Sequence, residues 1–93
     1  MSDEFKQVEL LDLEIESILN FFIGVLSTKA LLYLGIPVKQ SEKLEKDLEK
    51  ARLAIDTTSI MVEKLEPFIN EEELKQLKQV VSNLQFTFVR ESN

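Results

Sequence analysis

Apolar residues recur every three or four positions along most of this chain, which is the spacing of one face of an α-helix. Three such runs predict helices over about residues 7–34, 41–66 and 71–88. Gly and Pro number only two each, which favours long helices over sheets with many turns. We therefore expect an all-α fold: a three-helix antiparallel arrangement with coiled-coil-like seams, in a single domain spanning residues 1–93.

The first predicted helix carries apolar residues on two neighbouring stripes. One stripe contains Ile15, Leu19, Phe22, Leu26 and Ala30, and the next contains Ile18, Phe21, Val25 and Leu32. A helix on the surface of a globular protein usually buries one stripe against the core, and a chain this short can hardly cover both. We therefore expect this helix to assemble with further copies, as a dimer or a larger helical bundle.

The C-terminal end of the first helix has a clear signal. Gly35 suits the left-handed position after a helix, Ile36 can fold back onto the last turn, and Pro37 cannot continue the helix. We expect the helix to stop near Leu34.

The later helices have signals at their ends as well. Ser41 is a favoured N-cap residue, and Asn70 followed by Glu73 resembles a capping box. Pro67 removes a helical N–H, so the second helix is expected to end or kink there. Residues 86–89 also alternate like a strand, but one short strand has no partner in a helical chain, and we predict helix there.

Both later helices show the apolar spacing of a coiled-coil seam, the stripe that faces a neighbouring helix. The seam of the second helix contains Leu44, Leu48, Ala51, Ile55, Thr58, Val62, Leu65 and Ile69, and Ala54, Met61 and Phe68 widen it. The seam of the third helix contains Leu74, Leu77, Val81, Leu84 and Phe88.

Small and polar residues also form a stripe on the first helix. This stripe contains Asn20, Gly24, Ser27 and Thr28. A Gly inside a helix costs roughly 1 kcal/mol relative to Ala, so close approach of another helix would explain Gly24, and a tolerated Gly is the alternative. The residues that we predict at the interface between copies are Phe22, Gly24, Val25, Thr28, Leu31, Leu32, Ile55 and Val62.

Composition excludes much enzyme chemistry and makes nucleic acid an unexpected partner. The chain has no Cys and no His, which removes thiolate nucleophiles, imidazole bases and the commonest metal ligands. Its net charge of −6 opposes phosphate binding, which needs a basic face. The acidic start, Met1 to Glu4, lacks the basic region of a signal peptide, so we expect a cytoplasmic protein.

A membrane span is considered because residues 17–38 contain a single charge, Lys29. The uncharged run 17–28 is shorter than the roughly 20 residues that a span requires. A Lys in the middle of a bilayer would cost roughly 3 kcal/mol. We therefore expect no span.

Three groups of charged residues could carry chemistry. Lys29 could form a Schiff base if buried, but without a neighbouring base we expect it to reach water or an acid and not to be catalytic. Arg52 and Asp56 are spaced as a helical ion pair and could instead bind a small charged group. Acidic clusters at residues 12–16 and 71–73 could attract a cation, but acids in a first helical turn are expected from the helix dipole. We expect no metal and no cofactor.

From about Phe22 to Arg90 the chain resembles a family of short bacterial helical proteins catalogued as a domain of unknown function. The residues that carry the resemblance are Ala30-Leu31, Leu34-Gly35, Ala51-Arg52, Ile55-Asp56, Glu63-Lys64 and Glu72-Glu73. The chain departs from the family pattern at Thr57-Thr58 and Pro67-Phe68. The resemblance implies a compact helical protein and supplies no activity.

These observations leave two main hypotheses for function. The first is a self-associating structural or adaptor protein that acts through interfaces between helices, with its own copies or with a partner protein. The alternative is a carrier of a small apolar ligand or lipid within the helical bundle. A peripheral membrane protein is a third hypothesis, which the acidic N-terminus opposes. No enzyme activity is expected.

Overall fold

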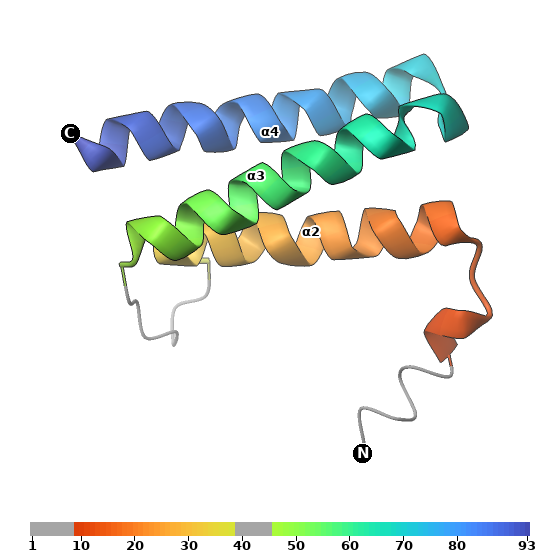
Figure 1. Ribbon diagram of the computed structural model, residues 1–93, viewed down its shortest axis with the longest axis horizontal. Coiled ribbons are helices and arrows are strands. Elements are labelled where there is room, and N and C mark those ends of the chain that lie inside the picture. Colours follow the sequence, from red (N-terminus) through yellow and green to blue (C-terminus); the bar gives the residue numbers. More distant parts are fainter. Residues whose placement is uncertain (1–8, 39–45) are drawn as a thin grey trace.

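The computed structural model describes residues 9–38 and 46–93, and this part of the chain is all-helical. Its main helices are α2 (Ile15–Tyr33), α3 (Leu48–Leu65) and α4 (Glu71–Ser92), and the short 3-10 helix η1 (Glu66–Phe68) joins the last two. Figure 1 shows α3 between α2 and α4, with successive helices running in opposite directions. The predicted all-α class is confirmed.

The helix α2 begins later than the pattern predicted. Residues 9–11 form a helical turn that breaks at residues 12–14, and Glu14 then serves as N-cap with an extended backbone. From Leu11 to Ile15, apolar and acidic residues alternate one by one. Residues two positions apart lie on different sides of an α-helix, so a helix here would have no continuous apolar face. The apolar side chains of this stretch are accordingly exposed.

The end of α2 agrees with the prediction in detail. Gly35 has a φ of +86°, the left-handed conformation expected directly after a helix. The Ile36 N–H donates to the Leu31 carbonyl at 2.9 Å and the Gly35 N–H donates to the Leu32 carbonyl at 3.0 Å, which is the Schellman pattern. Ile36 also packs against the core, as expected from its position after the glycine.

Two substitutions of the same kind should therefore have opposite effects on the free energy of unfolding. Gly35→Ala is expected to destabilise the protein by about 1 kcal/mol, because a Cβ is strained at positive φ. Gly24→Ala is expected to stabilise the monomer by up to about 1 kcal/mol, because Gly24 is helical and a Cβ there would meet no atom within 4 Å. Urea unfolding at low protein concentration measures both changes in the free energy of unfolding. Changes of the same sign would contradict the left-handed conformation of Gly35 or the helical, open position of Gly24.

The helix α3 begins at a different cap from the predicted one. The Asp47 side chain accepts a hydrogen bond from the Lys50 N–H at 3.1 Å and so caps the helix, whereas Ser41 lies outside the described residues. The Asp47 N–H donates to the Tyr33 carbonyl at 2.8 Å, which ties the start of α3 to the end of α2. Lys46 forms an ion pair with Glu91 at 3.4 Å, between the start of α3 and the end of α4.

The junction between α3 and α4 follows the predicted signals. The α-helix ends at Leu65, and Pro67 lies in the 3-10 turn that follows. The Asn70 side chain accepts a hydrogen bond from the Glu73 N–H at 2.8 Å and donates one to the Glu73 carboxylate at 3.0 Å. The predicted cap is confirmed, and so is helix at residues 86–89, since α4 continues to Ser92.

The core contains two apolar clusters, and all three main helices contribute to each. The buried residues of the first cluster are Ala30, Leu34, Ala51, Ala54, Ile55 and Leu84. Those of the second are Ile23, Val62, Leu65 and Val81. Thr58 is fully buried on α3, and its hydroxyl donates to the Ala54 carbonyl at 2.7 Å, so its polar atom is satisfied. The buried residues that α3 and α4 contribute lie on their predicted seams or, for Ala54, beside them.

Candidate functional site

The helix α2 is the most apolar of the three main helices, yet few of its residues are buried. Only Ile23 and Ala30 are buried along it, whereas α3 buries Ala51, Ala54, Ile55, Thr58, Val62 and Leu65. By length and composition alone α2 could cross a membrane, with a mean hydropathy of 1.5, and only 11% of this stretch is buried in the fold. The described part of the chain therefore leaves much of this apolar helix uncovered.

The uncovered side of α2 is opposite to its buried side. At about 100° per residue, Ile18, Phe21, Val25, Thr28 and Leu32 fall on one line, on the far side of the helix from Ile23 and Ala30. We name these five residues the outer face. Phe21 is 51% exposed and Val25 is 44% exposed, and Phe22 beside them is 41% exposed. An apolar surface of this extent on a soluble monomer usually marks an interaction site.

A broad open hollow of about 690 Å³ runs along the outer face. Its lining residues are Asn20, Phe21, Gly24, Val25, Thr28, Lys29 and Leu32. Gly24 faces open space in this hollow, since a Cβ at this position would have no neighbour within 4 Å. No helix of the described chain approaches Gly24, so a close contact there would come from outside the described residues.

The hydroxyl of Thr28 on the outer face is already paired within α2, as is the hydroxyl of Ser27 on the core-facing side. The Thr28 hydroxyl donates to the Gly24 carbonyl at 3.0 Å, and the Ser27 hydroxyl donates to the Ile23 carbonyl at 2.7 Å. An apolar partner could therefore cover Thr28 without leaving its hydroxyl unsatisfied, which would otherwise cost about 1–3 kcal/mol.

The predicted interface residues divide into two groups. Phe22, Gly24, Val25 and Thr28 are exposed, and Leu32 is half-buried on the same side of α2. Ile55 and Val62 are each only 3% exposed and belong to the two core clusters, so the interface role predicted for them is replaced by a core role. Leu31 packs against the first cluster. The coiled-coil spacing of α3 marked a seam correctly, but its partners are α2 and α4 of the same chain.

The structure adds Phe21 to the predicted interface set. Phe21 is more exposed than Phe22, and the two rings contact each other edge to face with centroids 5.6 Å apart. Its place on the second apolar stripe of α2 was the signal that could have selected it.

The charged candidates lie at the surface. The Lys29 ammonium is exposed and lies 5.1 Å from the centre of the Tyr33 ring, where Lys50 also approaches to 5.9 Å. Both distances are typical of cation–π contacts. Arg52 and Asp56 form the predicted ion pair at 3.9 Å, with both side chains mostly exposed.

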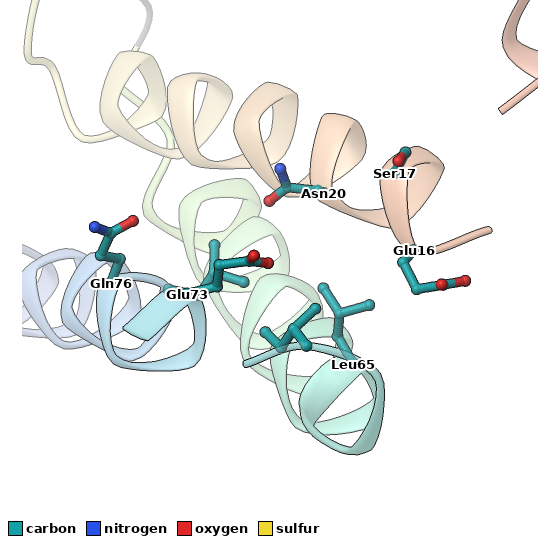
Figure 2. Close-up of a pocket in the computed structure, with 8 residues that line it drawn as sticks. Glu16, Ser17, Asn20, Leu65, Glu73 and Gln76 are labelled. Atoms are coloured by element: carbon teal, nitrogen blue, oxygen red, sulfur yellow. The ribbon is translucent and has the colours of Figure 1, made fainter. Parts of the chain in front are cut away.

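A separate small pocket of about 200 Å³ lies where the start of α2 meets the junction of α3 and α4. Figure 2 shows its polar side chains coming from α2 on one side, as Glu16 and Asn20, and from α4 on the other, as Glu73, with Leu65 of α3 between them. Within the described ranges no three acidic residues converge as metal ligands would. The pocket has the dimensions of a few water molecules.

Exposed apolar residues elsewhere are more scattered. Leu53 and Ile60 lie on α3, Phe68 lies in η1, and Val80, Phe86 and Val89 lie on α4. They are spread over these three elements, and single exposed apolar side chains are normal in soluble proteins. The outer face of α2 is therefore the strongest candidate site.

Comparison with known proteins agrees with the resemblance drawn from the sequence. A family model described as a domain of unknown function (DUF1844) matches residues 17–90. No curated protein and no solved structure matches the chain. The matched region contains α2, α3 and α4 almost completely. The protein therefore belongs to the DUF1844 family, a family without a described function from which no specific activity can be read.

Proposed function

We propose that this protein works by self-association, as a structural or adaptor protein without catalytic activity whose copies assemble into a helical bundle through the outer face of α2. One observation carries the proposal: the most apolar helix of the described chain leaves the side opposite its core contacts uncovered. Removing apolar surface from water contributes about 25 cal/mol per Å², so a second copy of the same face is a favourable cover.

A bilayer is a less suitable cover for α2 than another protein. The inner side of α2 supplies Ile23, Ala30 and the following Leu34 to the core. Insertion of α2 into a membrane would remove these residues and expose the apolar seams of α3 and α4 to water. The exposed Lys29 would also have to enter the hydrocarbon region.

A carrier function has less support from the described cavities. Sites for small apolar ligands usually enclose about 300–1,000 Å³ and bury most of the ligand. The pocket in Figure 2 has only about 200 Å³ and a rim of Glu16, Asn20 and Glu73. The larger hollow over Gly24 is open along one helix, which suits a protein side chain better than an enclosed ligand.

Analytical ultracentrifugation of the full chain tests the proposal, with two matched variants. Phe21→Ser removes an exposed ring from the outer face of α2, and Phe86→Ser removes an exposed ring from α4. We expect the parent to sediment as a dimer or larger assembly at micromolar concentration. Phe21→Ser is expected to weaken the assembly by about tenfold or more, as for an aromatic residue central to an interface, while Phe86→Ser leaves it unchanged.

The possible results separate the hypotheses. A folded parent that stays monomeric at high micromolar concentration contradicts self-association. An equal loss of assembly in both variants would place the interface elsewhere. Binding of the monomer to zwitterionic vesicles in a flotation assay would favour the membrane hypothesis instead.

A further inference from the structure

We propose that α2 pairs with α2 of a second copy in an antiparallel coiled coil centred between Phe21 and Val25. This inference rests on the proposed self-association and specifies its geometry. It is carried by the spacing of the outer face, by the hollow over Gly24 and by the distribution of charge along α2.

The spacing of the outer face matches a two-helix seam. From Ile18 through Phe21, Val25 and Thr28 to Leu32, the steps are three, four, three and four residues. This alternation keeps side chains facing one partner helix along its whole length. The core side of α2 is already occupied by α3 and α4, so the partner for this second seam has to come from outside the described chain.

The hollow over Gly24 has the lining of a hole in knobs-into-holes packing. Such a hole is formed by residues at i, i+3, i+4 and i+7. Phe21, Gly24, Val25 and Thr28 have this spacing and all line the hollow. Because Gly24 contributes no side chain, the hole can admit a knob as large as the Phe21 ring of the second copy. The same contact forms twice across the two-fold axis.

An antiparallel pairing brings complementary residues into the same layers. Phe21 then faces Val25 of the second copy, and Ile18 faces Thr28 of the second copy. Each layer thus pairs a larger side chain with a smaller one. The Thr28 hydroxyl already donates to the Gly24 carbonyl, so the second layer buries no unpaired donor.

Charge along α2 favours the antiparallel direction. Glu14 at the N-cap of α2 is exposed, and Lys29 lies on the exposed side near the end of the helix. In the antiparallel pair, Lys29 lies at the same end as Glu14 of the second copy. In a parallel pair, the two Glu14 side chains would instead lie at the same end and repel each other. The helix dipoles also attract each other in the antiparallel pair and repel each other in a parallel pair.

Disulfide cross-linking between two single-cysteine variants tests the direction. The chain contains no Cys, so only the introduced thiols can react. Ile18→Cys and Thr28→Cys are mixed as full-length proteins and oxidised, and products are identified by mass spectrometry of tryptic peptides. Facing residues in one layer come close enough for a disulfide, whereas residues about 15 Å apart along the axis cannot. Leu53→Cys, exposed on α3, serves as the control for random collision.

The expected product is the mixed disulfide between the Ile18→Cys variant and the Thr28→Cys variant, at several times the yield of any product of the Leu53→Cys control. If the main products instead join two copies of Ile18→Cys or two copies of Thr28→Cys, the pair is parallel and the inference is overturned. Yields no higher than the control, with a parent that still sediments as a dimer, would overturn the inference but leave self-association intact. A monomeric parent would overturn both. If either variant loses its helical circular dichroism, Phe21→Cys and Val25→Cys test the same register.

Discussion

Replacing Leu65 by Ala is expected to lower the free energy of unfolding by about 3 kcal/mol, within the usual range of about 2–5 kcal/mol for buried Leu→Ala changes. Leu65 is 1% exposed and lies in the second core cluster, where Ile23 of α2 and Val81 of α4 also meet. The loss combines the transfer free energy of the removed methyl groups with the cavity that remains. A domain of this size has a total stability of about 5–14 kcal/mol, so the effect is a large fraction of it.

A matched control for this variant lies on the same helix. Leu53→Ala changes the same residue type at a position that is 67% exposed, and it should alter the free energy of unfolding by less than about 0.5 kcal/mol. Urea unfolding at one fixed protein concentration gives both values, since assembly makes stability depend on concentration. Similar losses for the two variants would mean that Leu53 is covered in solution, and the orientation of α3 would then need revision.

Gly24→Leu is expected to weaken assembly by about 5- to 150-fold, corresponding to an overpacking cost of about 1–3 kcal/mol. The Leu side chain would fill the hollow that is open in the isolated chain and displace the side chain of the second copy. The same substitution should stabilise the monomer by most of 1 kcal/mol, because Leu forms helix better than Gly. Thr28→Leu, one turn along the same hollow, should weaken assembly in the same way.

The two opposite effects are measured separately. Sedimentation gives the dissociation constant, and thermal melting at low concentration gives the stability of the monomer. Gly24→Ala is the control, because a single methyl group supplies most of the helix propensity without filling the hollow. A higher melting temperature for Gly24→Leu with unchanged assembly would show that this side of α2 faces solvent in the assembly as well.

The signals within short stretches of sequence predicted the fold well. Gly35, Pro67 and Asn70 act where they were expected to act, because each depends on backbone geometry within a few residues. The apolar spacing of α3 and α4 also identified the buried residues, since a helix with one apolar stripe has only one way to face a core.

The identity of the partner for each stripe could not be predicted in this way. Ile55 and Val62 were expected between copies but pack within the chain, because periodicity shows that a face is buried and not what buries it. For α2, with two apolar stripes, the sequence could not indicate which stripe the chain itself covers. The choice depends on the geometry of all three helices together.

The two core clusters differ in the size of their side chains, and this difference sets the angle between α2 and α3. Ala30, Ala51 and Ala54 meet at one end, where small side chains let two helix axes approach closely. Ile23, Val62 and Leu65 are larger and lie toward the other end, where α2 and α3 diverge in Figure 1 and the pocket of Figure 2 opens. The three alanines therefore let the end of α2 lie close to the start of α3. The direction in which the outer face of α2 points thus depends on residues that are not part of that face.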